Sequence, residues 1–410
     1  MQNNRKKGKW LSMKVKESLK KYDEKIIKIS LILTLIIYFE PQMFKEDNFQ
    51  ILLSIDKVYK MLKIISFLII SIIYFRNKNI SKIFYAMVAF QIIAFISTFI
   101  NRGSINRMIG PGLTTLVMIM SAEIFLKNEE KIDIIKILNY YFRTIFLINV
   151  FFIVLVDGFK IYSDEIYFLG IDNRWIFSYI PWMFFEMMYS IYENKYINSY
   201  ISFALIEVTL IYRWTAAAFI INLLWLLPLI LKDRIKLAKY TVPTYIATVV
   251  ANLLIVVFKV QEHFTKLLSI LKKDPSLSGR TFLWNGVFEN TKSHPILGQG
   301  MQTIEYDKDF FGKTKNNELD FLKVPHAHNS YMTVLYRYGI MGLIAYIIPL
   351  LMSIINLQKN YKNKFANISF ICITVCLLLG IFDTLDCSMF YFALGFAYSI
   401  KNTQQEEKNK

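Results

Sequence analysis

The sequence predicts an all-α polytopic membrane protein with about twelve transmembrane helices and one large structured extracytoplasmic loop before the tenth span. Composition is the first reason. Of the 410 residues, 55% are hydrophobic and 16% aromatic, and the mean hydropathy is +0.37, which is more apolar surface than a soluble globule of this length buries. The second reason is that unalternating apolar runs recur along the chain, close to the length of about 20 residues that a helix needs to cross a bilayer. These runs are too long for barrel strands, and only a helix satisfies its own backbone amides in lipid.

The expected helices fall into two blocks, nine within residues 26–258 and three within residues 331–400. In chain order we expect them at 26–42, 58–75, 80–100, 108–126, 134–156, 174–192, 197–212, 214–231, 240–258, 331–356, 366–382 and 384–400. The first is short and ends near Glu40, and the sixth to eighth are crowded, so hydropathy alone allows about ten to thirteen spans.

The placement of Lys and Arg predicts that both termini are cytoplasmic. The basic segment 1–25 carries nine of these cations, and the short loops on the opposite side carry only six although they are longer. The short loops on the same side as the N-terminus carry twelve, at 76–79, 127–133, 193–196, 232–239 and 357–365. Positively charged loops stay in the cytoplasm, so segment 1–25 and the tail 401–410 are expected inside. The net charge of +17 then reflects orientation and attraction to anionic headgroups, and no nucleic-acid partner is expected.

One hydrophilic region, residues 259–330, interrupts the apolar pattern and is expected outside the membrane. A connection of this length is uncommon unless it is structured or functional. An apolar stripe predicts a short amphipathic helix at 263–273. A second helix is expected from Ser278, ending before Pro295, with Arg280 one turn before Trp284.

Candidate site residues converge on the outer membrane surface. His326 and His328 lie just before the span that starts near residue 331, and Arg280 lies in the outer loop. Arg213 is the one charge at the tight outer turn YRWTAAAF. Guanidinium groups keep their charge whereas imidazole titrates near neutral pH, so this set suggests an anionic group held beside a proton acceptor.

The string SGRTFLWNGVFENTKSHPILGQG, followed by HAHNSYMTVLYRYGIMG, resembles the signature of the O-antigen ligase and O-antigen polymerase superfamily of bacterial envelope glycosyltransferases. The resemblance implies transfer of a sugar chain from undecaprenyl diphosphate to an acceptor hydroxyl at the outer leaflet of the plasma membrane, without metal, nucleotide or other cofactor. It implies that His328 is the general base and that Arg213 and Arg280 bind the diphosphate. The chain departs from the family at Tyr212 and Trp214, where Ser or Thr often flanks the arginine.

Three functions remain open at this point. The first is a polymerase that joins lipid-linked repeat units into capsular, O-antigen or exopolysaccharide, and the second is a ligase that transfers the glycan to another acceptor. The third, a transporter of the same lipid, is disfavoured because the sequence shows no paired repeats or broken helices. Frequent Ile, Lys, Asn and Tyr favour the polymerase, since they suggest an AT-rich genome of the kind common where no lipopolysaccharide core exists. The expected partners are undecaprenyl-diphosphate-linked oligosaccharides and the bilayer, with chain-length regulator and flippase proteins as candidate partners.

Several further residues are secondary candidates, each with a structural alternative. Those named are His326, Asn329, Arg102, Arg107, Arg174, Asp383 and Asp386. His326 is the alternative base, Asn329 either orients the site or caps a helix, and the arginines either attract anions or anchor the protein at the membrane surface. The two aspartates are expected to contact the acceptor sugar. No metal is expected at the histidines, because the sequence places no carboxylate or cysteine beside them. The three cysteines, all in or beside the last two spans, are interpreted as small apolar residues.

Ionisable and small residues inside the spans complete the expectations. Glu186 and Glu207 lie within spans and are expected to pair with each other, with Arg143 or with a substrate hydroxyl. Gly339 and Gly342 are expected to allow close helix packing.

Overall fold

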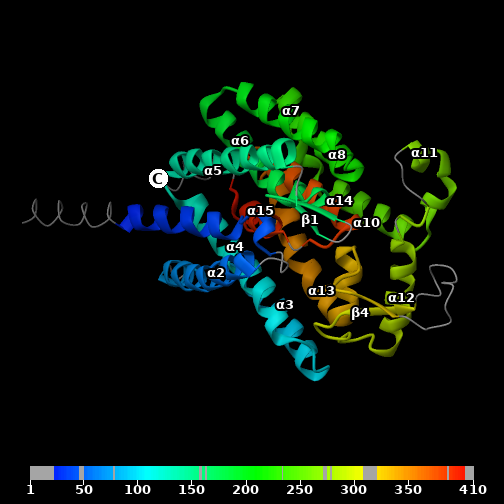
Figure 1. The fold of residues 1–410 in the computed structure, drawn as a ribbon. Helices are drawn as coiled ribbons and strands as arrows, with labels where there is room; N and C mark the ends of the chain where they lie inside the picture. The colour runs from blue at the N-terminus through cyan, green and yellow to red at the C-terminus, as the bar shows by residue number, and fades with distance from the viewer. Residues whose placement is uncertain are drawn as a thin grey trace, which may run out of the picture.

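The computed structural model describes most of the chain. The described residues are 23–45, 50–76, 79–156, 159–161, 164–232, 234–270, 275–277, 279–307, 321–385 and 387–401. They form an almost wholly helical bundle with small strands at one end (Figure 1).

Helices account for all twelve predicted apolar segments. The first is a helix over residues 23–38. The other α-helices are α2 (Gln50–Arg76), α3 (Lys82–Ile100), α4 (Ile105–Lys127), α5 (Lys131–Phe151), α6 (Ile176–Glu193), α7 (Ile197–Tyr212), α8 (Ala216–Asn222), α9 (Leu226–Leu231), α10 (Thr241–Val256), α11 (Thr265–Ile270), α12 (Arg280–Ser293), α13 (Ser330–Lys359), α14 (Ala366–Phe382) and α15 (Ser388–Ser399). Short helical turns are η1 (Gln42–Lys45), η2 (Phe152–Val156), η3 (Asp172–Arg174), η4 (Leu223–Trp225), η5 (Leu237–Tyr240) and η6 (Val260–His263).

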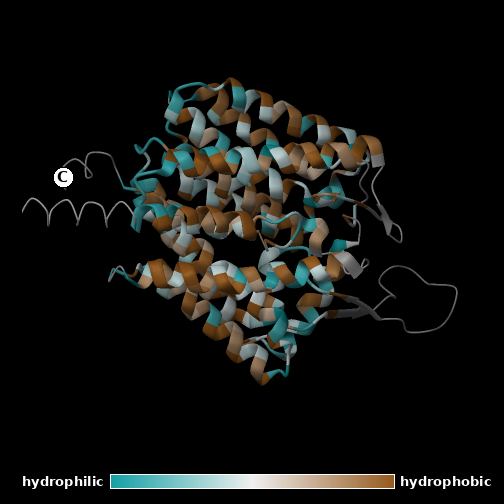
Figure 2. Ribbon diagram, turned by 60° about the vertical axis from the view of Figure 1, so that its left-hand side comes forward, coloured by the Kyte–Doolittle hydropathy of each residue, from teal (hydrophilic) through white to brown (hydrophobic). Residues whose placement is uncertain are grey.

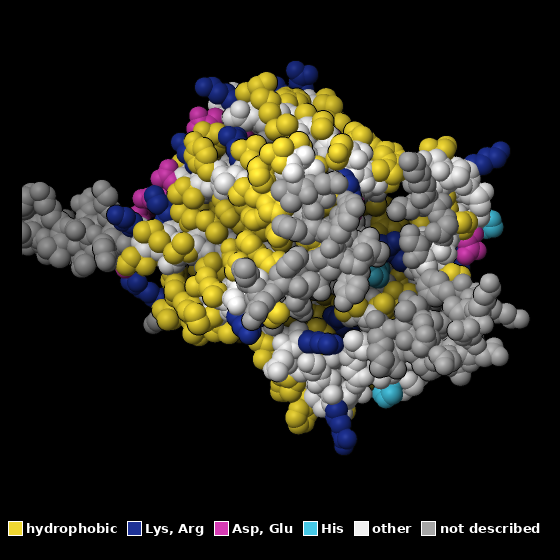
Figure 3. All heavy atoms as spheres, in the orientation of Figure 1, with side chains coloured by type: hydrophobic (Ala, Val, Ile, Leu, Met, Phe, Trp, Pro, Cys, Tyr) yellow, Lys and Arg dark blue, Asp and Glu magenta, His cyan; other side chains and the backbone are white. Residues whose placement is uncertain are grey.

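The all-α membrane fold is confirmed, whereas the number of spans stays a prediction. Within the described residues, six helices are long and apolar enough to cross a bilayer, and α7, α14 and the α8–α9 segment are shorter apolar helices. Many large apolar side chains on the bundle are exposed, among them Ile72 and Phe99, as expected of a surface that faces lipid (Figure 3).

The loops form two groups at opposite ends of the bundle, as the positive-inside pattern requires. At one end, Arg76 pairs with Asp23, and Lys28 pairs with Glu130 and Asp133. Further contacts at this end join Lys232 to Tyr196, Lys364 to Tyr192, Asn367 to Ile235 and Asn363 to Lys401. Helices α11 and α12 and strand β4 lie at the opposite end, and the helix shafts between are mainly hydrophobic (Figures 1 and 2). The loops that were predicted to lie on one side of the membrane therefore lie at one end of the bundle.

The centre of the bundle is built from α3, α4, α13, α14 and α15, which pack closely against one another. A cluster of buried aromatic rings from α4, α6 and α15 fills it, namely Phe125, Phe184, Phe185, Phe392 and Phe396. At Gly395 a Cβ atom would lie 2.9 Å from the Cα of Ile119, so α15 approaches α4 at backbone distance.

Helix α13 is broken, which corrects the expectation that the chain has no interrupted helix. Gly339 has φ of 61° and ψ of −162°, a conformation essentially restricted to glycine. Outer-loop residues occupy the break, and a Cβ atom on Gly339 would lie 2.3 Å from the carbonyl oxygen of Ile296. Four backbone hydrogen bonds join the two segments: Gln299 to Tyr336, Gly300 to Arg337, Ile340 to Pro295 and Met341 to Ile296. Gly339 therefore seats the outer loop against the helix, which goes beyond the helix packing expected of it.

The outer region contains the two expected helices and some unexpected strands. Helix α11 is shorter than predicted, and α12 ends before Pro295 as expected. Gly279 caps α12 instead of Ser278, which lies outside the described residues. Strands β4 (Ile304–Asp307) and β5 (Phe321–Val324) form an antiparallel pair, and β1 (Phe159–Ile161), β2 (Asp164–Tyr167) and β3 (Gly170–Ile171) form a small antiparallel sheet.

Candidate active site

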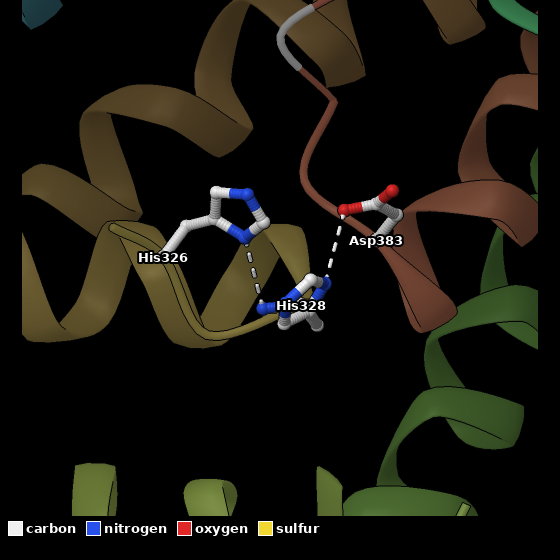
Figure 4. Close-up of side chains that lie close together, drawn as sticks. All are labelled: His326, His328 and Asp383. Atoms are coloured by element: carbon white, nitrogen blue, oxygen red, sulfur yellow. Dashed lines mark hydrogen bonds and ion pairs between the residues drawn. The ribbon is translucent and has the colours of Figure 1, made fainter. Parts of the chain in front are cut away.

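Two histidines and an aspartate from distant segments meet at the outer end of α13 (Figure 4). The Nδ1 atom of His328 lies 3.4 Å from Oδ1 of Asp383, which is within ion-pair distance but longer than a normal hydrogen bond. The rings of His326 and His328 stand edge to face with centroids 4.4 Å apart. His326 is buried, whereas His328 and Asp383 are partly exposed. An imidazole beside a carboxylate can take up a proton because the carboxylate stabilises the imidazolium.

The residues that follow His328 hold Asp383 in place. Asn329 caps α13 by accepting a hydrogen bond from the Met332 amide, and its amide group donates to the carbonyl of Ile381 at 3.0 Å. The hydroxyl of Ser330 accepts from the Leu385 amide at 2.9 Å. The chain on both sides of Asp383 is therefore tied to the first residues of α13. This explains how an aspartate 55 positions later reaches His328.

His328 has a backbone conformation that is uncommon for a residue other than glycine. Its φ is 47°, in the left-handed region, which histidine adopts more readily than most side chains but still at a cost. The sharp turn lies between β5, which ends at Val324, and α13, which starts two residues after His328. Surrounding hydrogen bonds at Ala327, Asn329 and Ser330 maintain the turn.

Helix α12 brings Arg280 to the same region. Trp284 is fully buried and donates its indole N–H to the carbonyl of Ala327, between the two histidines, at 2.9 Å. Arg280 lies one turn earlier on the same face, as predicted. Its guanidinium donates to the carbonyl of Leu277 at 3.0 Å, and its buried Nε has no hydrogen-bond partner among the described residues. Burial lowers the pKa of Arg280, and the Asp383 carboxylate partly offsets this effect.

Two cavities meet at Asp383. One, of about 320 Å³, is mainly apolar and is lined by Arg280, Asp383, Phe382, Leu277 and residues of α8. The other, of about 360 Å³, is more polar and is lined by His326, Asp383, Arg174, Glu40, Thr384 and Ser388 among others. Asp383 and Phe177 border both cavities. The arrangement thus offers an apolar chamber with a half-buried cation and a polar chamber, both bordered by Asp383; His326 lines the polar chamber, and His328 lines neither.

Arg213 lies beside this region but not on the walls of either cavity. It caps the C-terminus of α7, its guanidinium lies over the ring of Tyr167 at 5.1 Å, and its Nε is 3.8 Å from a carboxylate oxygen of Asp172. Its near neighbours Thr215 and Asn173 do line the apolar cavity. The structure therefore gathers His326, His328 and Arg280 around Asp383, with Arg213 next to them.

The secondary candidates separate into those that border the cavities and those that do not. Arg174 lines the polar cavity, and Arg107 lines a further cavity described below. Asn329 is fully buried and serves as cap and tether. Arg102 lines none of these three cavities, and Asp386 lies outside the described residues.

The acidic residues predicted within the spans find partners inside the protein, although Oε2 of Glu207 has no hydrogen-bond partner among the described residues. Glu186 is fully buried and accepts hydrogen bonds from the guanidinium of Arg143 at 2.8 and 2.9 Å, one of the expected pairings. Glu207 accepts from the side-chain amide of Asn222 at 2.7 Å, a partner that the sequence did not predict. These contacts are remote from the histidines in the sequence and support helix packing.

The histidine cluster also has the composition of a cation site, contrary to the sequence-based argument that no carboxylate would be placed beside it. One donor atom each from His326, His328 and Asp383 lie within 4.8 Å of one another. Two imidazoles and a carboxylate are a common ligand set for zinc. The sequence missed this set because Asp383 follows a different span, and only the packing of α13 against α14 brings it to the histidines.

Comparison with known protein families shows what this region resembles. Residues 202–347 match a family model described as O-antigen ligase, and the match includes Arg213, Arg280, His326 and His328. It ends before Asp383. No curated protein matches the chain. Residues 202–347 are therefore similar to the O-antigen ligase family, which supports the resemblance of the chain to the O-antigen ligase and polymerase superfamily.

Proposed function

We propose that the protein is a glycosyltransferase that polymerises undecaprenyl-diphosphate-linked oligosaccharide repeat units at the outer leaflet. The observation that carries the proposal is the His328–Asp383 pair, in which Asp383 borders both an apolar chamber lined by the half-buried Arg280 and a polar chamber lined by His326. A polyprenyl diphosphate suits the apolar chamber, because its tail is hydrophobic and its head is anionic. A sugar acceptor suits the polar one.

In the proposed reaction, His328 accepts the proton of an acceptor hydroxyl. The hydroxyl oxygen attacks the anomeric carbon of the donor sugar, and the bond from that carbon to the diphosphate oxygen breaks. Arg280 stabilises the negative charge that develops on the leaving diphosphate, since a half-buried guanidinium interacts strongly with phosphate oxygens. Asp383 stabilises the imidazolium that forms. Arg213 contributes positive charge beside the same chamber.

A ligase that transfers the same donor to another acceptor is the second candidate, favoured by the description of the matching family. Both candidates use the same base and the same leaving group. They differ only in the molecule that occupies the polar chamber, so the product distinguishes them.

The test is a reconstituted reaction in detergent with lipid-linked repeat units extracted from source cells that lack this protein. We expect a ladder of longer glycans that remain attached to the lipid. His328→Ala and Arg280→Gln should each lower the rate at least a hundredfold, because removal of a general base or of a transition-state donor costs about that much.

His294→Ala is the matched control, because His294 is an exposed loop histidine that contacts Ser293 and Gln299. It should retain normal activity. If the glycan were transferred only to a carrier other than the lipid, the protein would be a ligase and not a polymerase. An unchanged ladder of glycans with the His328→Ala variant would show that His328 is not the general base.

A further inference from the structure

We propose that Arg107 and Arg337 form a second anion-binding subsite, which holds a carboxylate or phosphate group on the acceptor glycan. The proposal rests on the proposed function, because it assigns the ligand of this subsite to the acceptor. It concerns a buried arginine that neither the sequence motifs nor the proposed chemistry accounts for.

Arg337 is a buried cation in the outer part of α13. Its side chain is 9% exposed, and its buried Nε has no hydrogen-bond partner among the described residues. One terminal nitrogen donates to the carbonyl of Pro325 at 2.6 Å. Within the described part of the chain, no carboxylate lies at ion-pair distance from it. Burial of an unpaired charge is expensive, so a site that keeps one is a candidate for binding an anion.

The backbone around Arg337 fixes its direction. Its carbonyl accepts hydrogen bonds from the Ser97 hydroxyl at 2.8 Å and the Gly300 amide at 2.7 Å. Gly339, which breaks the helix, follows two residues later. Side chains on a helix lean toward its N-terminus, so the guanidinium extends back toward the histidines. The contact with Pro325 places it against the peptide that leads into His326.

A cavity of about 300 Å³ adjoins this guanidinium. It is lined by Arg107, Met301, Gln302, Thr303, Pro325 and Arg337. Arg107 is exposed and lies in the first turn of α4. Two guanidinium groups and a glutamine amide, with no carboxylate among the described lining residues, can donate hydrogen bonds to the oxygens of a carboxylate or phosphate.

The position of this cavity assigns it to the acceptor. Pro325 lines both this cavity and the polar cavity that contains His326 and Asp383. Arg280 lines the apolar chamber, which also borders Asp383 but which Arg337 does not line. An anion at Arg337 is therefore separated from the proposed donor diphosphate by the histidine cluster. It belongs to the substrate that enters from the polar side.

The experiment measures binding to the purified full-length protein in detergent, so it needs no turnover. The probes are a glucuronate-containing tetrasaccharide, a neutral glucose tetrasaccharide and inorganic pyrophosphate. We expect the wild type to bind the acidic tetrasaccharide at least tenfold more tightly than the neutral one. Arg107→Gln and Arg337→Gln should abolish this preference, whereas Arg280→Gln should preserve it and weaken pyrophosphate binding.

Two controls keep the outcome interpretable. Arg102→Gln removes a neighbouring exposed arginine that does not line this cavity, and it should preserve the preference. Arg107→Gln tests the subsite even if Arg337→Gln fails to fold, because Arg107 is exposed.

Equal binding of both tetrasaccharides by the wild type would overturn the subsite, and so would a preference that survives Arg107→Gln. Loss of pyrophosphate binding in Arg107→Gln, but not in Arg280→Gln, would overturn the assignment to the acceptor. An inactive enzyme that keeps the preference would count against the proposed reaction and leave the subsite standing.

Discussion

The chemistry proposed for His328 depends on Asp383 remaining ionised. Burial raises the pKa of Asp383, but contact with His328, the Thr384 amide and the positive charge of the two histidines lower it more. The pKa of this carboxyl group thus lies below its ordinary value of 3.8. The carboxylate is then anionic wherever imidazole titrates, between about pH 5 and 8. Its contribution to stability is fully present above pH 3.8 and is lost as the pH falls below that value.

The first prediction concerns the pH dependence of Asp383→Asn. The wild-type rate should fall at acid pH as the imidazole becomes protonated. In the variant, the maximal rate should fall by about tenfold or more and the acid limb should move to lower pH, because the carboxylate no longer stabilises the imidazolium. Initial rates from pH 5 to 9 measure this. Glu289→Gln, which removes an exposed outer-loop carboxylate paired with Lys292, should leave the profile unchanged. If the acid limb did not move in Asp383→Asn, Asp383 would have no influence on the protonation of the base.

The second prediction distinguishes a free base from a metal ligand in the same three side chains. A base must keep one ring nitrogen of His328 free to accept a proton, so the reaction should not need a cation. Dialysis against EDTA should leave the rate within about twofold of the untreated enzyme. Loss of activity that Zn²⁺ restores would instead assign His326, His328 and Asp383 to a metal site.

The break in α13 is the element that joins the outer loop to the bundle. Gly298 and Gly339 meet back to back, and a Cβ atom on Gly298 would lie 2.5 Å from the carbonyl oxygen of Tyr336. The loop supplies partners for backbone groups that the break leaves without helical hydrogen bonds. The same loop continues into Met301 and Gln302, which line the cavity of Arg337. The break therefore sets both the position of the loop and the shape of that cavity.

The third prediction is that Gly339→Ala destabilises the protein by about 2 kcal/mol or more. Alanine would have to adopt a conformation that only glycine tolerates, and its Cβ would overlap the Ile296 carbonyl. Thermal unfolding in detergent measures the effect. Gly112→Ala in α4 is the control, because the added methyl group would meet only the end of the flexible Gln91 side chain, and its melting temperature should stay close to that of the wild type. Equal melting temperatures for the two variants would show that the break in α13 does not require glycine at position 339.

For the molecule as a whole, function requires that the histidine cluster and the basic loops lie on opposite sides of the membrane. The contacts among residues 23–28, 76 and 130–133 place the basic loops together at the end away from α12. The cytoplasmic position of the termini and the extracytoplasmic position of the site stay predictions from the positive-inside rule.

The fourth prediction tests that orientation by labelling introduced cysteines. Lys292→Cys, in α12, should react with a membrane-impermeant maleimide on intact protoplasts, whereas Lys362→Cys should react only after permeabilisation. Both positions are exposed, and Cys372, Cys376 and Cys387 are buried, so the background should be low. The opposite labelling pattern would show that the orientation of the protein is reversed and that the proposed site faces the cytoplasm.

The candidate site was predictable only where its residues share a local motif. His326, His328 and Arg280 lie within strings that resemble a known family, and α12 shows that Arg280 and Trp284 share a face at the expected spacing. Asp383 could be named from its position at an outer turn, but its pairing with His328 could not. Arg337 lies within one of these strings but was assigned no role, since one arginine near the outer end of an apolar run is typical of a membrane-surface anchor.

The sequence alone determined the helical membrane architecture and the division of the loops into two sides. Apolar length and the distribution of Lys and Arg act locally, and lipid allows few other structures for such runs. Only the tertiary structure decided that Asp383 reaches His328, that α13 breaks at Gly339, and that Arg337 lines a cavity beside Pro325. Those contacts join segments tens to hundreds of residues apart, and they depend on side-chain packing between helices, which hydropathy does not encode.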